Sequence, residues 1–364
     1  MKLLVLGANS QLGRALGALL QAKGINFEAI QTRNLDLLQP SAVVKTLSRL
    51  APTQVINVTT YANLEKAERD PAAARECDIV NTSGVSTLAE VCKHLDLPLL
   101  HHSSSYVFDG LKVHPYTVTD DTNPVCRYGQ SKWYGERAIR DALPTHVILR
   151  TDWIFSRERP QFFQRHIEAC KQNRGRLEVM NHRFSPTPAA DVARVLLAIA
   201  EQVDCQADVW GTYHYCALQP MSQEFFVEHL LQEAARYDPE LAALLPDLQI
   251  TKLPVQKPYI PNTVLSSQRL FETFGIKQRT RAGELNALLQ GLYGISTEQD
   301  GAVAVVGPDD AEQPEPSSAE FPSPSAPRTS RVRGNAKQAP VRSSAADSKP
   351  PAKTDAAQKV SPRS

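Results

Sequence analysis

The sequence predicts an α/β fold: a doubly wound parallel sheet, a smaller C-terminal cap and a disordered tail. Three observations support this prediction. Short apolar runs alternate with amphipathic stretches, the first apolar run ends in a glycine-containing loop, and the composition changes near residue 296. Strands that alternate with crossover helices form parallel sheets. The 364 residues allow two domains, at roughly 100–200 residues per domain.

The alternating pattern occupies the first 155 residues, where apolar runs predict strands and periodic stretches predict helices. The expected strands cover residues 2–6, 27–30, 54–58, 98–102 and 146–150. The expected helices cover residues 11–21, 41–50, 72–94 and 131–142. Ser41 follows Pro40 and is the predicted N-cap of its helix.

Beyond residue 155 the pattern is less regular, which predicts a separate cap over residues 156–295 that contacts the substrate. Helices are expected at 189–201, 222–235, 266–274 and 281–293, and extended segments at 213–217 and 249–255. We expect the elements between about 187 and 217 to return to the first domain, residues 1–155.

The tail, residues 296–364, has one aromatic residue, Phe321, and ten of the 26 prolines. Such a segment buries too little apolar surface to offset its ordering entropy, so we expect it to be disordered. Acidic residues gather in its early part and basic residues in its later part. Both a solvated extension and a tether for an acidic partner or nucleic acid fit this pattern.

Composition also predicts the compartment and the partners. The formal net charge of +1 argues against nucleic-acid binding by the folded part. The N-terminal apolar run stops at Gly7, which is too short for a signal peptide, and no apolar run is long enough to span a membrane. Six scattered cysteines without a CxxC pair predict reduced thiols in the cytoplasm and no zinc site.

Residues 7–13 follow the first strand and open the first helix, which is where a Rossmann-type fold holds a dinucleotide pyrophosphate. Gly7 allows a tight turn, and Gly13 allows close packing of helix on sheet. The expected contacts to the cofactor are Gly7, Asn9, Ser10, Gln11, Leu12 and Gly13. A plain strand-to-helix turn without a nucleotide is the alternative.

The end of the second strand indicates which dinucleotide is preferred. NAD-binding folds usually place an acidic residue there for the ribose 2′-hydroxyl. Residues 31–33 are Gln-Thr-Arg, and Arg33, with Arg14 nearby, has the charge to pair with a 2′-phosphate. The sequence therefore favours NADP(H) and leaves NAD(H) open, and solvated surface arginines are the alternative interpretation.

Tyr128 and Lys132 are four residues apart, so on a helix they share one face. A nearby ammonium would lower the pKa of the tyrosine and suit it to proton transfer. Ser104 lies at the end of the fourth strand, and the carboxyl ends of strands border the ligand crevice in such sheets. Its hydroxyl could bond a carbonyl oxygen that Tyr128 protonates, although a polar loop explains the serines equally well.

Together these blocks resemble the extended short-chain dehydrogenases/reductases, and more narrowly the dTDP-4-dehydrorhamnose reductase family of sugar-nucleotide reductases. The matching blocks are 7–13, Asn34-Leu35-Asp36-Leu37, 57–68, Val80-Asn81, 103–110, 128–132 with Gly135-Glu136, 149–153, and Pro186-Thr187 with Asp191. The Tyr-Val-Phe-Asp-Gly and Arg-Thr-x-Trp blocks are the specific ones, and the matches span almost all of the first 295 residues.

The resemblance implies roles for individual residues. Tyr128 would protonate the C4 keto oxygen, Ser104 would bond the same oxygen, and Lys132 would hold the nicotinamide ribose while the cofactor delivers hydride to C4. Further cofactor contacts are implied for Arg33, Asp36, Leu37, Asn57, Val58, Thr59, Tyr128 and Lys132. Substrate contacts are implied for Ser105, Tyr106, Val107, Phe108 and Trp153, although Trp153 also fits a partly buried core position.

The chain departs from the family in the phosphate loop and in the cap. Ser10 replaces a glycine, Ser105 replaces an acidic residue, and Val58-Thr59 replaces a pair of alanines. Ala15 replaces a glutamate, so we expect no metal site. Residues 181–184 and 259–263 differ from the family pattern, and a basic substrate contact is lost.

Intact catalytic residues beside a changed cap favour NAD(P)H-dependent reduction of a different 4-keto nucleotide sugar. Two alternatives stay open: a non-catalytic, dinucleotide-binding regulatory subunit, and a sugar-nucleotide epimerase that recycles NAD. A homodimer also stays open.

Overall fold

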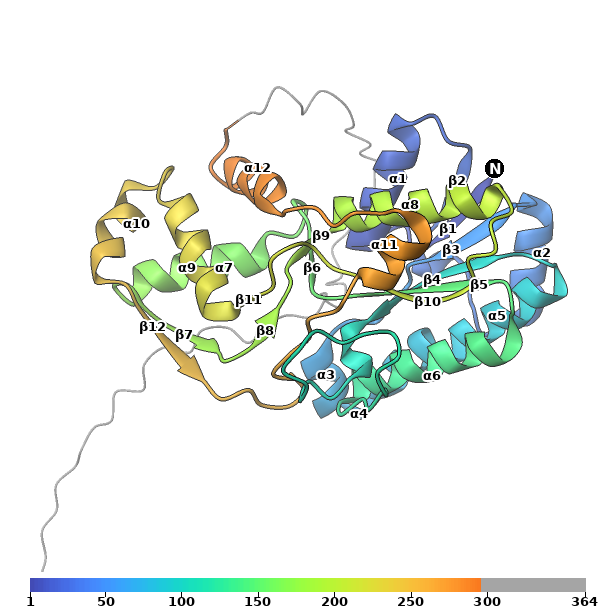
Figure 1. Ribbon diagram of the computed structural model, residues 1–364, viewed down its shortest axis with the longest axis horizontal. Coiled ribbons are helices and arrows are strands. Elements are labelled where there is room, and N and C mark those ends of the chain that lie inside the picture. Colours follow the sequence, from blue (N-terminus) through green and yellow to red (C-terminus); the bar gives the residue numbers. More distant parts are fainter. Residues whose placement is uncertain (296–364) are drawn as a thin grey trace, which may run out of the picture. The chain divides into compact units, whose positions relative to one another are not determined.

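The computed structural model describes residues 1–295, and the predicted disordered tail at 296–364 lies outside them. A six-stranded parallel sheet has the order β10-β5-β4-β3-β1-β2 (Figure 1). Its strands are β1 (Leu3–Leu6), β2 (Phe27–Ile30), β3 (Gln54–Asn57), β4 (Leu99–Ser104), β5 (His146–Thr151) and β10 (Gly211–Tyr215). Because β2 and β3 lie on opposite sides of β1, the winding reverses there. The predicted doubly wound sheet is confirmed.

Helices cover both faces of this sheet. One face carries α1 (Gln11–Ala22), α8 (Ala189–Asp204) and α11 (Gln268–Phe274), and the other carries α2 (Pro40–Leu50), α5 (Gly84–His94) and α6 (Arg127–Ala142). Successive side chains of a strand point to opposite faces. Leu3 and Val5 therefore pack with the first set of helices, and Leu4 and Leu6 with the second. Burial on both faces explains why β1 reads as an unbroken apolar run.

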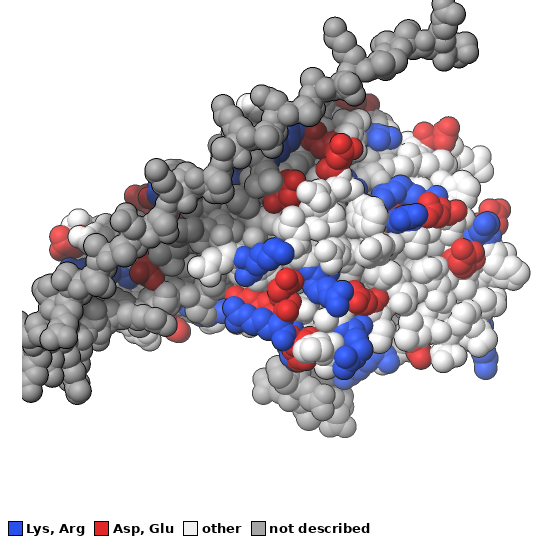
Figure 2. All heavy atoms as spheres, turned by 90° about the horizontal axis from the view of Figure 1, so that it is seen from below, with Lys and Arg blue, Asp and Glu red and all other residues white. Residues whose placement is uncertain are grey.

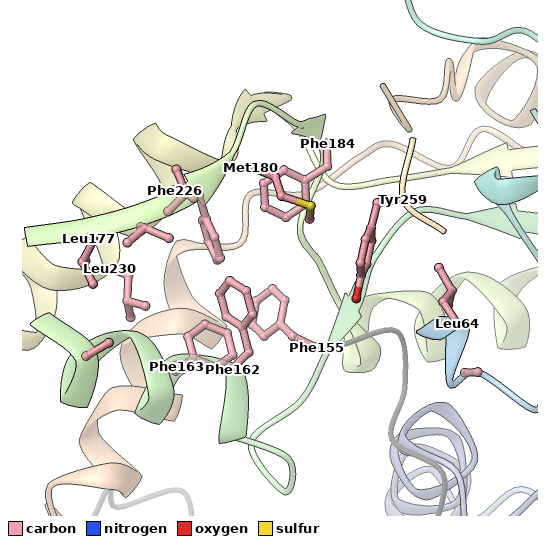
Figure 3. Packing of buried hydrophobic residues seen from close by; sticks show 14 of the residues in the cluster. Leu64, Phe155, Phe162, Phe163, Leu177, Met180, Phe184, Phe226, Leu230 and Tyr259 are labelled. Atoms are coloured by element: carbon pink, nitrogen blue, oxygen red, sulfur yellow. The ribbon is translucent and has the colours of Figure 1, made fainter. Parts of the chain in front are cut away.

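The predicted cap shares its apolar core with Tyr61, Leu64 and Tyr128 of the first 155 residues. It contains α7 (Gln161–Gln172), α9 (Gln223–Ala234), α10 (Pro239–Leu244) and α12 (Ala282–Leu292), with the parallel pair β7 (Arg176–Met180) and β12 (Gln249–Leu253). Two short pairs lie beside them: β6 (Ile154–Phe155) with β9 (Thr187–Pro188), and β8 (Arg183–Phe184) with β11 (Met221–Ser222). Phe162, Phe163, Phe184 and Phe226 pack at the centre of this core (Figure 3).

Several element boundaries differ from those expected. The expected helix at 72–94 is α4 (Pro71–Asp78) and α5, joined by a π-helical turn over Ile79–Ser83. Ser41 is not an N-cap, since α2 begins one residue earlier with Pro40, whose fixed φ suits a first helical position. The helix expected from 131 begins at Arg127, capped by the Cys126 thiol. Neither α7 nor the short α3 (Leu64–Arg69) was expected from the sequence.

A buried ion pair holds α6 on the sheet. The Arg150 guanidinium donates two hydrogen bonds to the Glu136 carboxylate, Nε to Oε1 at 2.8 Å and Nη2 to Oε2 at 2.6 Å. Both side chains are almost fully buried. Burial alone would raise the pKa of Glu136, but Arg150 outweighs it and holds the pKa at about 2. Glu136 lies one turn beyond Lys132, so the pair fixes the helix that carries Tyr128 and Lys132.

We expect Arg150→Met to lower the free energy of unfolding by about 3 kcal/mol, because it removes two charge-assisted hydrogen bonds from the buried Glu136 carboxylate and leaves it paired with Arg140 alone. Since the pair depresses the pKa of Glu136, its stabilisation is present above the ordinary pKa of glutamate and is lost as the pH falls towards about 2. Urea unfolding at several pH values measures both effects. Arg137→Met is the matched control, because the Arg137–Asp141 pair on the same helix is exposed and should contribute less than about 1 kcal/mol. Equal losses in the two variants would contradict the assignment.

Candidate active site

The loop after β1 and the loop after β3 meet where the sheet winding reverses. Gly7 has a φ of 89°, and a Cβ there would lie 2.6 Å from the Thr59 backbone nitrogen. A Cβ on Gly13 would lie 2.1 Å from the Gly7 carbonyl oxygen. Both positions therefore require glycine. In such sheets ligands bind at the carboxyl ends of the strands beside the winding reversal.

The polar residues of the first loop have defined partners. The Ser10 hydroxyl caps α1 by accepting the Gly13 N–H at 3.0 Å. Asn9 Oδ1 accepts the backbone N–H of Thr32 at 3.1 Å, which ties the loop to the end of β2. The Arg14 side chain donates to the Asn9 carbonyl at 3.2 Å. Ser10, which replaces a family glycine, thus stabilises the helix end, while Gln11 and Leu12 continue the first turn of α1.

The segment after β2 brings Arg33 to the rim of this loop. Arg33 is exposed in a 3₁₀ turn, Thr32–Asn34, and its Nε donates to Gln31. The Asp36 carboxylate accepts the Leu38 N–H at 2.9 Å, and Leu37 packs on the α2–α5 face of the sheet. The structure thus gives Asp36 and Leu37 partners within the fold, and their contact with a cofactor stays a prediction.

Asn57 and the two residues after it lie at the carboxyl end of β3, beside the loop that follows β1. Asn57 is fully buried, and its Oδ1 accepts the Thr59 backbone N–H at 3.0 Å. The Val58 N–H donates to the Leu6 carbonyl at 2.9 Å, so the β1–β3 ladder continues past the strand end. The bulk of Val58 and Thr59, where the family has alanines, is accommodated within this turn.

Ser104, Thr60 and Tyr128 come together from three elements. Ser104 ends β4, Thr60 follows β3, and Tyr128 lies in the first turn of α6. Burial raises the pKa of Tyr128 to about 12, while hydrogen bonds from Ser104 and Thr60 act to lower it. The expectation that Lys132 lowers the pKa is not met, because burial dominates. A phenol with this pKa stays protonated near neutral pH, as a proton donor requires.

Lys132 lies four residues after Tyr128 in α6 and is almost fully buried. Its Nζ donates to the His102 carbonyl at 2.7 Å and lies 3.5 Å from His101 Nε2. Burial lowers the pKa of Lys132 to about 8, although Glu136 and Cys77 favour the ammonium. The lysine thus contacts the β4 backbone while Tyr128 contacts hydroxyl groups.

Two glycines let α6 approach the site closely. A Cβ on Gly129 would lie 2.1 Å from the Tyr106 carbonyl oxygen, and one on Gly135 would lie 2.2 Å from the Asn81 carbonyl oxygen. Asn81 lies in the π-helical turn and bonds both the backbone of Tyr61 and the Ser131 hydroxyl. The turn therefore links the loop after β3 to α6, and π-helical turns are frequent at functional sites.

The residues after Ser104 separate into two groups. The Tyr106 ring meets the Tyr128 ring edge-on at 5.8 Å between centroids. Val107 and Phe108 are fully buried in another cluster, where Phe108 stacks on Tyr116 at 4.2 Å. This placement brings Tyr106 to Tyr128 and gives Val107 and Phe108 a packing role, so their predicted substrate contact gains no support from the geometry.

Asp152 is a buried carboxyl close to the same edge. Burial raises its pKa to about 7, although the backbone N–H groups of Ser185 and Trp153 donate hydrogen bonds that act to lower it. Ser105 replaces an acidic residue of the family pattern, and it lies beside a different acidic residue, Asp152, which directly follows β5. This carboxyl links β5 to the segments around 185 and 263.

Tyr128 belongs to the same hydrophobic cluster as the aromatic side chains of the cap. Trp153 is partly buried against the cap core, with its ring 4.7 Å from that of Phe162. Tyr259 lies between Phe184 of the cap and Leu64 of α3 (Figure 3). Its hydroxyl donates to Glu65 Oε1 at 3.1 Å. Tyr259, at the start of the segment where the family carries a basic residue, therefore bridges the cap and α3.

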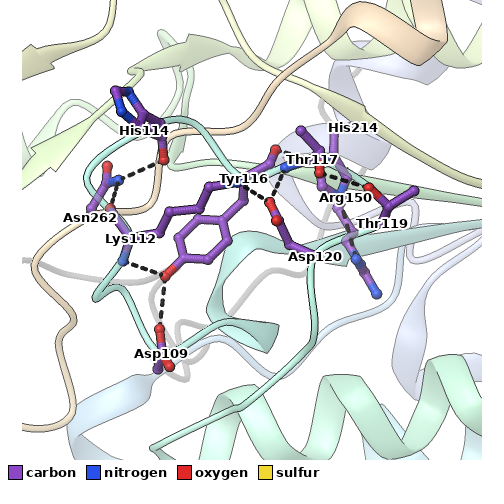
Figure 4. Close-up of polar contacts among 10 residues, drawn as sticks. All are labelled: Asp109, Lys112, His114, Tyr116, Thr117, Thr119, Asp120, Arg150, His214 and Asn262. Carbon is purple, nitrogen blue, oxygen red and sulfur yellow. Dashed lines mark hydrogen bonds and ion pairs between the residues drawn. The ribbon is translucent and has the colours of Figure 1, made fainter.

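The long loop between β4 and α6 is held by a polar network (Figure 4). The Tyr116 hydroxyl donates to Asp109 at 2.8 Å, and Lys112 pairs with Asp120. Asn262 donates to the Lys112 carbonyl at 2.6 Å. His214 connects the Tyr116 backbone with Arg150. In the segment 259–263, which differs from the family pattern, Asn262 thus holds the loop between β4 and α6 in place.

Sequence reasoning missed Thr60, His101 and Asp152. His101 and Asp152 lie in or beside buried strands, and Thr60 lies in a loop, so no spacing pattern marks them. Thr60 directly follows the predicted Thr59, but its proximity to Tyr128, like the contact of His101 with Lys132, arises only on folding. The histidine pair at residues 101–102, directly after the apolar start of β4, was the one available signal.

The surface adds no strongly charged region on the side that can be seen. In Figure 2, Lys and Arg side chains lie among Asp and Glu side chains. None of the helices among residues 1–295 combines the length and apolar character that a membrane span requires. Within that part of the chain, no group of three or more His, Cys, Asp or Glu side chains could hold a metal ion.

Comparison with known proteins gives a consistent result. The family model described as the RmlD substrate binding domain matches residues 1–293. A dTDP-4-dehydrorhamnose reductase of Sinorhizobium fredii is 32% identical over 282 residues, which cover 76% of this chain and 93% of the relative. A crystal structure of a dTDP-4-dehydrorhamnose reductase from Clostridium acetobutylicum has a TM-score of 0.69 and 26% identity, and the match covers 80% of this chain and 99% of that one. The corresponding enzyme from Bacillus anthracis, in complex with NADP, has a TM-score of 0.65 at 20% identity, over 80% of this chain and 98% of that one.

We expect Gly13→Ala to weaken binding of NADPH and NADH at least tenfold, because the new Cβ would lie 2.1 Å from the Gly7 carbonyl and displace the loop. Gly17→Ala on the same helix is the matched control, since the nearest atom to its Cβ would be 4.0 Å away. Fluorescence titration of each cofactor measures the change. Unchanged affinity in Gly13→Ala would show that this loop does not hold the dinucleotide.

Proposed function

The chain belongs to the family described as the RmlD substrate binding domain, and from that premise we propose that it reduces the 4-keto group of a nucleotide sugar with NADPH or NADH. This is the activity of an NAD(P)-dependent oxidoreductase of the short-chain dehydrogenase/reductase type. The observation that carries the proposal is the meeting of Ser104 and Tyr128 at the strand edge where ligands bind.

The chain's own residues supply the proton and its placement. Tyr128 is the general acid: burial keeps its hydroxyl protonated until a substrate oxygen is in place. Ser104 donates to the same oxygen, so the two hydroxyls stabilise the negative charge that develops there. When bound, a nicotinamide cofactor supplies the hydride.

The cofactor would lie along the loops after β1 and β3. The glycines at positions 7 and 13 let the loop pack closely on the Thr59 backbone and on the first turn of α1, whose N–H groups would face a pyrophosphate. Asn57, Val58 and Thr59 would flank the cofactor from the loop after β3, and Lys132 would hold the nicotinamide ribose. These roles fit the Rossmann arrangement of the sheet.

The cofactor preference rests on the rim beside β2. Arg33 is exposed next to Thr32, whose backbone bonds Asn9, and Arg14 bonds the same loop. Two guanidinium groups at this rim favour NADP(H), because arginine binds phosphate with paired N–H donors.

The substrate belongs to the nucleotide sugars, and the cap selects which one. Trp153, Tyr106 and Tyr259 give this side an aromatic character. Tyr259 stands where the family carries a basic residue, and its hydroxyl donates a hydrogen bond to Glu65. We therefore expect the preferred nucleotide sugar to differ from dTDP-4-dehydrorhamnose in the group that this basic residue would contact.

We expect Tyr128→Phe to reduce ketosugar-dependent NADPH oxidation at least a thousandfold, because it removes the proton donor, while cofactor affinity changes little. The assay screens 4-keto nucleotide sugars by absorbance of NADPH. Tyr134→Phe, which removes an exposed hydroxyl on the same helix, is the matched control. Turnover that persists in Tyr128→Phe would refute the proton-transfer role. Purified protein that carries tightly bound NAD and interconverts nucleotide sugars would indicate the epimerase instead.

We expect Arg33→Ala to weaken NADPH binding about tenfold, the equivalent of one charge-assisted contact, and to leave NADH binding nearly unchanged. Arg49→Ala, an exposed arginine in the last turn of α2, controls for net charge. Calorimetry with both cofactors separates the two effects. Equal losses for NADPH and NADH would remove the case for a 2′-phosphate contact.

A further inference from the structure

Three buried side chains join the end of β3 to α6 through the centre of the sheet. Asn57 ends β3, His101 lies in β4 and Lys132 lies in α6. Asn57 and His101 are fully buried, and Lys132 is 1% exposed. Asn57 Nδ2 lies 3.1 Å from His101 Nδ1, and His101 Nε2 lies 3.5 Å from Lys132 Nζ. No motif in the sequence gives His101 a role.

The backbone decides which way the Asn57 amide points. The Thr59 N–H can only donate, and it donates to Asn57 Oδ1 at 3.0 Å. The Thr59 hydroxyl donates to the same oxygen. The carbonyl side of the amide is therefore committed to Thr59, and its NH₂ group faces His101.

The amide in turn decides the tautomer of His101. Because Asn57 donates to Nδ1, that nitrogen must be the acceptor, and a neutral imidazole then carries its hydrogen on Nε2. Burial, with the nearby Lys132 charge, holds the pKa of His101 well below its usual range, so the ring is neutral. The Nε2–H bond is consequently directed at Lys132.

An ammonium and an amine fit this position differently. Lys132 Nζ already donates to the His102 carbonyl at 2.7 Å. A lysine ammonium has three donors and no acceptor, so it opposes an incoming N–H, whereas the neutral amine offers a lone pair to it.

We propose that His101 is a positioning residue for Lys132: held by Asn57 with its proton on Nε2, it directs an N–H at Nζ and favours the uncharged amine. The significance of this inference rests on the reductase proposed above, in which Lys132 would hold the nicotinamide ribose. His101 touches neither substrate nor cofactor and acts through Lys132.

Other groups around Lys132 act in both directions. Glu136, one turn further along α6, and Cys77 of α4 favour the ammonium. His102, the other titratable group on β4, is neutral because burial lowers its pKa to about 3. Burial of Lys132 itself favours the amine. His101 therefore favours the amine form of Lys132, as burial does, and opposes Glu136, which favours the ammonium.

The first experiment reads the tautomer of the full-length wild-type protein and needs no turnover. In ¹⁵N-histidine-labelled protein, we expect His101 to keep an unprotonated Nδ1 and a protonated Nε2 from pH 6 to 9, with His101→Gln used to assign its signals. A proton on Nδ1, or a titration of the ring within this range, would overturn the proposal.

The second experiment reads Lys132 directly. In protein labelled with ¹³Cε-lysine, with Lys132→Met to assign the signal, we expect His101→Leu to raise the pKa of Lys132 by about one unit. His101→Gln, which keeps an N–H donor, should leave it near the wild-type value. An unchanged pKa in His101→Leu would overturn the proposal. Both results are independent of catalysis, so a failed reductase assay would count against the proposed function alone.

Discussion

The ion pair between Glu136 and Arg150 is the interaction on which the candidate site depends. It joins α6 to β5 inside the sheet and directs two parallel hydrogen bonds between charged groups. Removing either partner from such a pair leaves an uncompensated charge in a medium of low dielectric. The helix that it fixes carries Tyr128 and Lys132, and Gly129 lets that helix touch the backbone after β4. The placement of Tyr128, the proposed proton donor, thus follows from a contact that lies outside the site.

Burial, more than local charge, controls the protonation of the site. Tyr128 and Lys132 share a helix face, yet the tyrosine pKa rises because water is excluded from its hydroxyl. The same exclusion lowers the pKa of Lys132 and raises that of Asp152. A tyrosine that stays protonated is suited to donate a proton, while a lysine with a lowered pKa changes charge near working pH.

The departures from the family pattern have structural consequences that are visible in the fold. Ser10 caps α1, and Asn262 holds the long loop before α6. Tyr259 bridges the cap to Glu65. The changed residues of the cap therefore contribute to packing and to the wall that faces Tyr128. The residues proposed for the chemistry come from β4 and α6, and the changed residues come from the phosphate loop and from the cap side.

The sequence by itself determined the sheet, its winding and the phosphate loop, because apolar periodicity and the Gly7–Gly13 spacing are local properties of the chain. Membership of the reductase family was also readable, since its motifs are short and ordered. Only the tertiary structure decided the pKa of Tyr128 and the chain of contacts through His101. Those properties depend on groups that are distant in sequence and on the water excluded when β3, β4 and α6 pack together, and no spacing in the chain encodes them.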